Sequence, residues 1–405
     1  MSMEYIRKQY HTLSERIQEP RRFMQVIAGP RQVGKSTLVG QLLRDVSIPH
    51  SIAVADAINP KDSDWIHRVW EAARTTMRIN SETEYLLVID EIQKIDNWSE
   101  MVKREWDEDT HKQVNLKVVL LGSSRLLLKR GLTESLAGRF ELIRFGHWSY
   151  QEMHDAFGIG LEEYIYFGGY PGAADLIGDE KRWRKYIKDS LVAPAIEKDV
   201  LMTSNIYKPA LMKQLFELGC GYSAEMLSLT KLMGQLQDAG NVTTLASYLE
   251  ILDQCALLTG LQKYAHDDAR KRSSIPKYQV YNNALLTAYK GRSFPLDRTD
   301  PMLWGRWVES AVGAHLLGMA EEVDYQVYYW RESVRSKAER DMEVDFIVVN
   351  SGEVTAIEVK SGRRGMNSGL PAFEKAFHPK RSIVVGTGGV SLEDFLSCDI
   401  ETLLS

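Results

Sequence analysis

Met24-Gln-Val-Ile-Ala-Gly-Pro-Arg-Gln-Val-Gly-Lys-Ser-Thr37 is the stretch that decides the fold of this chain. Its apolar residues 26–28 predict a buried parallel strand, and Gly29-x-x-x-x-Gly34-Lys35-Ser36 is the full phosphate-loop pattern. The two glycines let the backbone N–H groups point at a phosphate. Residues 37–44 favour a helix, whose N-terminus would face the same anion. The other interpretation, an accidental glycine-rich turn, does not explain the strand before it and the helix after it.

The loop predicts contacts to a nucleotide and a metal ion. Lys35 reaches the β- and γ-phosphates, and the Ser36 hydroxyl is a magnesium ligand. The residues expected to line the nucleotide are Gly29, Pro30, Arg31, Gln32, Val33, Gly34, Lys35, Ser36 and Thr37.

A second apolar run, residues 85–89, ends in Asp90 and Glu91. This pattern predicts a central parallel strand with carboxylates at its C-terminal edge, where the phosphate loop also lies. Asp90 would complete the magnesium shell, and Glu91 would orient or deprotonate the attacking water. A buried strand that ends in solvated acids is the alternative. An Asp-Glu pair, rather than Asp alone, favours a hydrolase over a kinase.

Two further residues follow the next strands, and each has two interpretations. Residues 118–122 predict a third buried strand, after which Ser123 would sense the γ-phosphate or simply form a cap or turn. Arg139 precedes a strand over 141–145 and is either an arginine finger or a surface salt-bridge residue.

Composition limits the class of protein. The 405 residues suggest roughly two to four domains, and 44% hydrophobic with 26% charged residues is typical of a soluble globular protein. Three widely spaced cysteines offer no disulfide framework or zinc pattern, so we expect a cytoplasmic protein. No apolar run is long enough to predict a membrane span. A net charge of −5 gives no sign of nucleic-acid binding by the chain as a whole.

The middle of the chain is predicted to be helical. Short helices at 224–229, 230–236 and 243–252 and a strand at 257–264 predict a winged helix. Residues 241–253 contain no lysine or arginine, so a packing or protein-contact role is favoured over reading DNA sequence. Residues 270–277 predict a basic surface loop.

The last part of the chain contains a hairpin with acidic positions. A helix near 301–320 carries Glu309, and strands are expected at 326–331, 343–349, 354–361 and 381–386. If Ser351-Gly352 is a two-residue turn, paired positions sum to 703 and Asp345 lies opposite Glu358. Carboxylates directly across a ladder repel, and a divalent cation would relieve that repulsion.

Taken in order, the ATPase motifs resemble the prokaryotic AAA+ superfamily ATPases that carry a C-terminal domain of unknown function. The resemblance rests on the phosphate loop, Ile-Asp-Glu-Ile-Gln-Lys94, Leu-Gly-Ser-Ser-Arg125, Ser-Leu-Ala-Gly-Arg139 and Gly168-Gly-Tyr-Pro171. It implies ATP rather than GTP, with Mg²⁺, and a nucleotide contact by Gly169 and Pro171.

The C-terminal hairpin resembles the metal-dependent nuclease core written acid, Asp, then Glu-x-Lys. This resemblance implies magnesium ligation by Glu309, Asp345 and Glu358, with Lys360 assisting the attacking water. Residues 265–405 carry 18 Lys and Arg against 20 Asp and Glu, a local net charge of −2, which disfavours a DNA-cutting groove. A nuclease-like fold kept as a scaffold is the alternative.

The expected fold class is α/β. It comprises a P-loop AAA+ core (1–150), a helical lid (151–206), a winged-helix domain (207–265) and a restriction-endonuclease-like domain (266–405). Three functions compete: an ATP-gated nuclease, a nucleotide switch whose C-terminal domain binds a partner without cutting, and a slow ATPase that acts as a scaffold. The expected partners are nucleic acid, DNA rather than RNA, through the C-terminal domain, and further copies of the chain; no membrane contact is expected.

Overall fold

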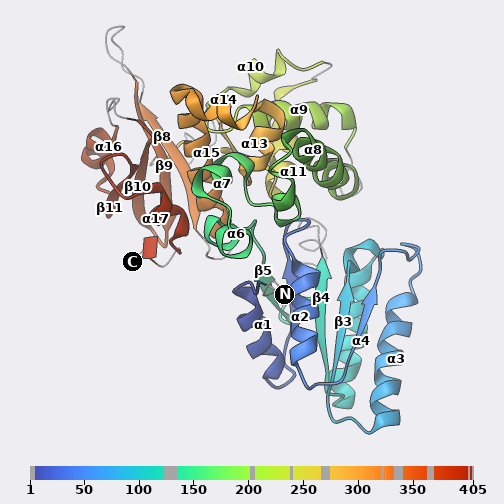
Figure 1. Cartoon of the computed structure of the whole chain (residues 1–405). Coiled ribbons are helices and arrows are strands. Elements are labelled where there is room, and N and C mark those ends of the chain that lie inside the picture. Colours follow the sequence, from blue (N-terminus) through green and yellow to red (C-terminus); the bar gives the residue numbers. More distant parts are fainter. Residues whose placement is uncertain are drawn as a thin grey trace. The chain divides into compact units, whose positions relative to one another are not determined.

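The computed structural model describes residues 5–122, 135–200, 206–237, 240–265, 274–320, 323, 325–332, 341–362, 369–399 and 402–403. The chain divides into two compact units, Met1–Phe145 and Gly146–Ser405, which we call the first and second units (Figure 1). The first unit is built on a parallel sheet, and the second combines a helical part with an antiparallel-rich sheet.

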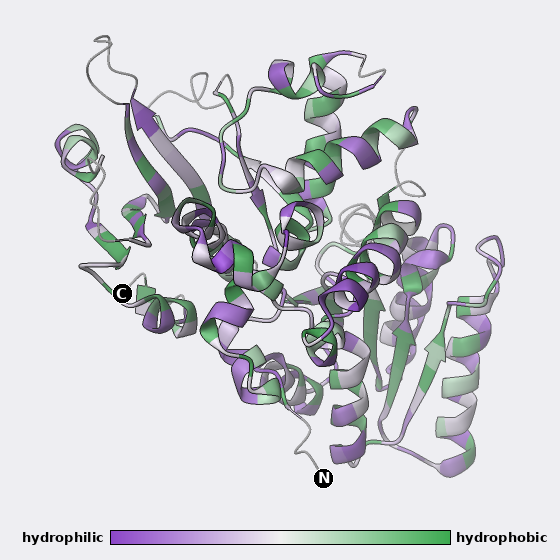
Figure 2. Cartoon of the chain, turned by 45° about the horizontal axis from the view of Figure 1, so that its top comes forward, coloured by the Kyte–Doolittle hydropathy of each residue, from purple (hydrophilic) through white to green (hydrophobic). Residues whose placement is uncertain are grey.

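The first unit is organised around a five-stranded sheet in the order β2-β3-β4-β1-β5, in which every described strand pair is parallel. Its strands are β1 (Met24–Ala28), β2 (His50–Val54), β3 (Tyr85–Asp90), β4 (Leu116–Gly122) and β5 (Phe140–Arg144). Every residue of β1 and β4 is buried, as expected for parallel strands that helices cover on both faces. Figure 2 shows this apolar character along the strands of the sheet.

Strand order places the carboxyl end of β4 between those of β1 and β3. The phosphate loop follows β1, and Asp90 ends β3, so both lie at the same edge of the sheet. The expected strands at 26–28, 85–89, 118–122 and 141–145 are confirmed within a few residues at their ends.

The helices in the described part of the first unit are α1 (Gln9–Gln18), α2 (Lys35–Asp45), α3 (Trp65–Asn80) and α4 (Trp98–Lys112), with the 3-10 helix η1 (Ile92–Lys94). Helix α1 ends at Gln18, since Glu19 is extended (φ −66°, ψ 157°). The cause is Pro20, which disfavours helical backbone in the residue before it.

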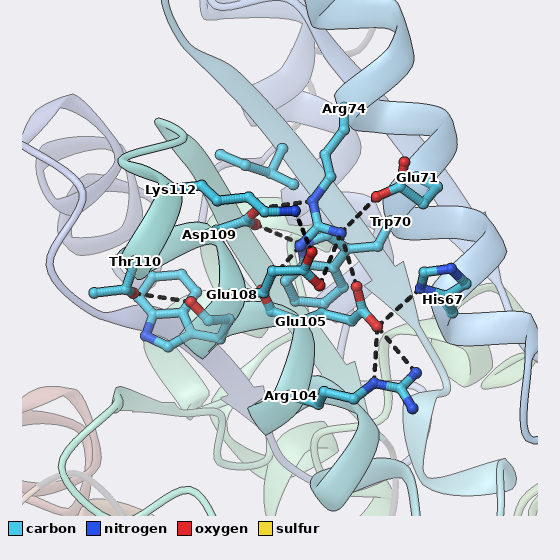
Figure 3. Close-up of polar contacts among 12 residues, drawn as sticks. His67, Trp70, Glu71, Arg74, Arg104, Glu105, Glu108, Asp109, Thr110 and Lys112 are labelled. Atoms are coloured by element: carbon cyan, nitrogen blue, oxygen red, sulfur yellow. Dashed lines mark hydrogen bonds and ion pairs between the residues drawn. The ribbon is translucent and has the colours of Figure 1, made fainter.

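Helices α3 and α4 are joined by a buried network of ion pairs (Figure 3). The Arg74 guanidinium donates to Asp109 Oδ1 at 2.7 Å and to Glu105 Oε2 at 2.8 Å. The Trp70 indole donates to Asp109 Oδ2 at 2.7 Å. Both carboxylates are fully buried and Arg74 is 5% exposed, so each charge depends on its partners for compensation.

The second unit begins with a helical part. Its helices are α6 (Tyr150–Phe157), α7 (Leu161–Phe167), η2 (Pro171–Leu176), α8 (Glu180–Lys185), η3 (Tyr186–Val192), η4 (Ala195–Val200), α9 (Pro209–Gly221), α10 (Leu229–Met233), α11 (Val242–Gln254), α13 (Asn283–Lys290) and α14 (Phe294–Thr299). Strands β6 (Leu258–Leu261) and β7 (Lys277–Val280) form a two-stranded antiparallel sheet among them.

Two expectations for this region are wrong. Of the helix expected at 224–229, residues 224–228 are not helical: Ala224 has a φ of 63°, and Met226 bridges to Lys277 instead. Lys277 is not part of a surface loop but lies fully buried at the start of β7. The expected helix at 243–252 is confirmed as α11, where the Asn241 side chain caps the Thr244 N–H. The assignment of a lid and of a winged helix stays a prediction.

The last part of the second unit is a four-stranded sheet in the order β11-β10-β9-β8. Its elements are α15 (Pro301–Ala320), β8 (Gln326–Glu332), β9 (Met342–Asn350), β10 (Glu353–Lys360), α16 (Leu370–Phe377), β11 (Arg381–Gly386) and α17 (Leu392–Ser397). Strands β10 and β11 are parallel, and the other pairs are antiparallel. The helix and four strands expected here are confirmed, while the nuclease-like assignment stays a prediction.

None of the helices in the described part of the chain has the length and apolarity that a membrane span requires.

Candidate functional site

The phosphate loop has the backbone that its glycines predict. A Cβ atom on Gly29 would lie 2.4 Å from the Phe145 carbonyl oxygen, so no other residue fits there. Gly34 has a φ of 88°, a left-handed conformation that glycine adopts without strain, and α2 begins at the next residue. The loop therefore leads from β1 into the N-terminus of a helix, which is the geometry of an anion site.

Lys35 and Ser36 lie on the first turn of α2. Lys35 Nζ donates to the carbonyl oxygens of Gly29 at 3.0 Å and Pro30 at 2.6 Å, so its ammonium lies over the loop. The Ser36 hydroxyl donates to Asp90 Oδ2 at 2.7 Å. The structure therefore brings together a hydroxyl and a carboxylate from two distant motifs, and these two oxygens are ligand types that Mg²⁺ accepts. This donor set fits a magnesium–nucleotide complex.

Glu91 is held in a defined place beside Asp90. Its backbone has a φ of 55°, and its N–H donates to Asp90 Oδ1 at 2.8 Å. The Gln93 side chain donates to Glu91 Oε2 at 2.7 Å, and Lys94 Nζ lies 3.9 Å from the same oxygen. Gln93 therefore orients the carboxylate, a role that the motif containing it did not predict.

Arg7 is a second residue that sequence reasoning missed. It is 4% exposed, and its guanidinium donates to the Val33 carbonyl oxygen in the phosphate loop at 3.0 Å. The same group lies 5.3 Å from the centre of the Phe145 ring. Arg7 thus stabilises the conformation of the phosphate loop through its hydrogen bond to Val33. It precedes the first strand and belongs to no nucleotide motif, so only the three-dimensional structure reveals it.

The remaining residues of the predicted nucleotide site divide into three groups. Arg31, Gln32, Val33 and Thr37 lie in or directly after the loop, as their positions require, while Ser123 lies outside the described residues. Gly169 and Pro171 belong to the second unit, where the Gly169 N–H donates to Asn282 Oδ1 at 3.1 Å and Pro171 starts η2. Their contact with nucleotide stays a prediction.

Arg139 forms a two-pronged ion pair with Asp107. Its Nε and a terminal nitrogen donate to the two carboxylate oxygens at 2.7 and 3.0 Å, and the Arg139 side chain is 31% exposed. The hydrogen bond to Arg139 lowers the pKa of Asp107. This geometry favours the surface salt-bridge interpretation within one chain.

We expect Arg139→Ala to reduce stability by no more than about 1 kcal/mol and to leave ATP hydrolysis per chain close to the wild-type rate. Phosphate release at several protein concentrations measures this. An arginine finger supplied by a neighbouring copy gives the opposite result: activity per chain rises with concentration, and the substitution loses on the order of 10³-fold.

In the second unit, the predicted hairpin register is confirmed. The pairs run from Glu353 with Asn350 to Ile357 with Phe346, so paired positions sum to 703. Ser351 and Gly352 have φ values of 50° and 86°, as a tight two-residue hairpin turn requires.

The prediction that Asp345 and Glu358 share one face is nevertheless wrong. Strand β9 has an irregularity where it pairs with β8, because Tyr328 pairs with Ile347 but Trp330 pairs with Val344. Val344 and Ile347 consequently pack into the same apolar core with α16, although three positions separate them. Glu358 is two residues from Ala356 and pairs with Val384, both of which pack in that core. Asp345 Oδ1 instead faces Lys277 at 3.6 Å, and Asp345 Oδ2 accepts a hydrogen bond from the Val359 N–H at 2.7 Å, so an extra residue in β9 takes Asp345 out of the face that Glu358 shares with Ala356.

Three carboxylates surround the ammonium group of Lys277, which lies on β7. Its Nζ atom lies 2.5 Å from Glu309 Oε1, 3.4 Å from Glu343 Oε1 and 3.6 Å from Asp345 Oδ1. Burial alone lowers the pKa of Lys277, but these three carboxylates raise it above its usual value. Lys360 contacts Glu358 at 3.6 Å instead. In the described part of the chain, no three Asp, Glu, His or Cys side chains are arranged to hold a metal ion.

Strand order, phosphate loop and the Ser36–Asp90 contact define the first unit as a P-loop domain of the AAA ATPase class. The comparisons agree: residues 21–154 match the AAA domain family. Residues 159–295 and 304–398 match two domains of unknown function (DUF8612 and DUF4143). The chain is 24% identical over 375 residues to an uncharacterized protein of Methanocaldococcus jannaschii, covering 87% of this chain and 78% of the relative.

Two solved structures are similar at a lower level. Both are Thermotoga maritima RuvB, one a single-residue variant and the other described as the Holliday junction branch migration motor. The variant is 15% identical, covers 64% of this chain and 90% of its own, and has a TM-score of 0.36. The motor is 17% identical, covers 62% and 85%, and has a TM-score of 0.34.

Proposed function

We propose that this protein binds ATP with Mg²⁺ and hydrolyses it in the first unit. The observation that carries the proposal is the 2.7 Å contact between Ser36 and Asp90, which joins the phosphate loop to the acidic end of β3. Two motifs separated by more than fifty positions meet at the edge where α/β sheets bind their ligands. The match to the AAA domain supports ATP as the nucleotide.

Each residue of the site has a distinct role in this proposal. The loop N–H groups hold the phosphates, and Lys35 leaves the loop carbonyl groups to contact the β- and γ-phosphates. Ser36 and Asp90 hold the magnesium ion, which when bound neutralises charge on the phosphoryl oxygens. Glu91, oriented by Gln93, accepts a proton from the attacking water.

The direct test is nucleotide binding by Lys35→Ala. We expect binding of a fluorescent ATP analogue to weaken by about 10- to 100-fold, because a charged hydrogen bond contributes about 1.5–3 kcal/mol. Lys61→Ala is the matched control, since Lys61 is exposed and outside the loop. Unchanged affinity in Lys35→Ala would remove the phosphate-binding role, and competition by ATP against GTP tests the preferred nucleotide.

The role of the second unit has two candidates. One is a metal-dependent nuclease that ATP drives; the other is a nucleotide-gated switch or scaffold that binds a partner without cutting. The position of Lys277 among Glu309, Glu343 and Asp345 favours the second, because a lysine already lies where the nuclease resemblance implies a metal ion. We therefore propose that ATP binding in the first unit controls partner binding by the second, in a chain that assembles with further copies.

A basic pocket supports an anionic partner such as DNA. It has a volume of about 870 Å³ and contains five cationic and three acidic residues. The lining residues are Gly178, Asp179, Glu180, Lys181, Arg184, Lys185, Lys188, Asp189, Arg292 and Ser293. The excess of positive charge is local, since the whole chain carries a net charge of −5. The pocket lies within the predicted lid region and the segment that follows α13, rather than in the predicted nuclease centre.

A further inference from the structure

The Lys277 side chain is 1% exposed, which is rare for lysine in any protein. An ammonium group loses its hydration when it is buried, and only close negative charge offsets that loss. Around Lys277 Nζ the negative charge comes from Glu309 on α15 and from Glu343 and Asp345 on β9. The Asp345 backbone carbonyl accepts a further hydrogen bond at 3.3 Å, and the Phe346 ring centre lies 5.0 Å away.

The three carboxylates require a nearby cation, just as the buried Lys277 ammonium requires nearby negative charge. Three carboxylates within reach of one point repel one another, and a divalent ion with oxygen ligands is the common solution. Here the ammonium group stands at that point. The fourth acid, Glu358, packs on the opposite side of the sheet and pairs with Lys360. The residues present therefore do not fit the metal site that the nuclease resemblance implies.

We propose that the Lys277 ammonium takes the place of a divalent cation at this acidic centre, so that Glu309, Glu343 and Asp345 bind lysine and no metal ion. We call these four residues the lysine centre. The centre joins β7, which lies in the segment matching one family, to α15 and β9, which lie in the segment matching another. Its role is to clamp these two segments of the second unit together, independently of ATP hydrolysis.

Manganese binding tests the proposal directly. The probe is MnCl2, followed by the electron paramagnetic resonance signal of the free ion, with full-length, nucleotide-free protein carrying Asp90→Asn to disable the metal site of the first unit. We expect this protein to bind no Mn²⁺ that depends on Asp345. Adding Lys277→Met should create a site for one ion per chain, and adding Asp345→Asn to that variant should remove it. Lys360→Met is the matched control and should create no site.

Each outcome decides the proposal. Mn²⁺ binding by the lysine-containing protein that Asp345→Asn abolishes would overturn it, and this measurement needs no change at Lys277. A folded Lys277→Met variant that gains no site would overturn it as well. If Lys277→Met is too unstable to purify at ordinary temperature, its melting temperature should rise with added MnCl2 by several degrees more than that of the lysine-containing protein; equal responses count against the proposal. The Mn²⁺ measurements on the second unit do not depend on ATP binding, which Lys35→Ala tests in the first unit. Either proposal can therefore be wrong while the other holds.

Discussion

Glu91→Gln should reduce ATP turnover by about 10²- to 10⁴-fold, the usual contribution of a positioned general base. Nucleotide affinity should change little, because the phosphate loop and the Ser36–Asp90 pair are untouched. Glutamine has the size of glutamate, and the Glu91 N–H bond to Asp90 Oδ1 belongs to the backbone, so local structure is retained. The substituted side chain still accepts the Gln93 hydrogen bond but no longer takes a proton from water.

Two measurements separate turnover from binding. Phosphate release at saturating ATP gives turnover, and a fluorescent ATP analogue gives affinity. Glu15→Gln on the exposed side of α1 makes the same chemical change away from the site and should behave as wild type. A Glu91→Gln protein that hydrolyses ATP at the wild-type rate would show that another group activates the water. A parallel loss of affinity would indicate damage to the loop instead.

Local pattern was sufficient to predict much of this structure. The phosphate loop and the strand that ends in Asp90 each carry a specific spacing, and the Ser36–Asp90 contact follows from the edge that they share. The turn at Ser351-Gly352 fixed the hairpin register, because two-residue loops allow one pairing. In each case the signal lies within a few neighbouring residues.

What the sequence did not predict depends on contacts between distant residues. The extra residue in β9 cannot be detected from the sequence pattern of the strand. It nevertheless takes Asp345 out of the face of the sheet that Glu358 shares with Ala356. Lys277 follows three cationic residues in a segment that predicts a surface loop, and only the carboxylates of α15 and β9 explain its burial. Arg7 likewise lies outside every motif, and only its hydrogen bond to the Val33 carbonyl oxygen connects it to the phosphate loop.

Arg74→Met should destabilise the first unit by about 3–5 kcal/mol, since removal of one member of a buried ion network leaves uncompensated charge. Glu105 and Asp109 are fully buried, and both lose the Arg74 guanidinium, although Glu105 keeps a contact of 3.0 Å with Arg104. Methionine fills much of the space of the arginine side chain. The loss of stability therefore reflects the removed charge more than a change in side-chain volume. Arg78→Met is the matched control: the Arg78 side chain is 67% exposed on the same helix, and its loss should change stability by less than about 0.5 kcal/mol.

The dependence on pH distinguishes charge from packing. Hydrogen bonding to Arg74 lowers the pKa of Glu71 below its usual value of 4.5, so that carboxylate stabilises the wild type above this pH and the contribution disappears on acidification. In Arg74→Met this contribution is absent at every pH, so acidification costs the variant less stability than it costs the wild type. The stability difference between wild type and variant, measured by urea unfolding from pH 7 down to pH 4, should therefore narrow. Adding Glu105→Gln and Asp109→Asn to Arg74→Met should recover part of the loss at pH 7, because the two buried side chains then carry no charge. A difference that stays constant with pH, with no recovery in the triple variant, would mean that Arg74 stabilises the helix pair by packing alone.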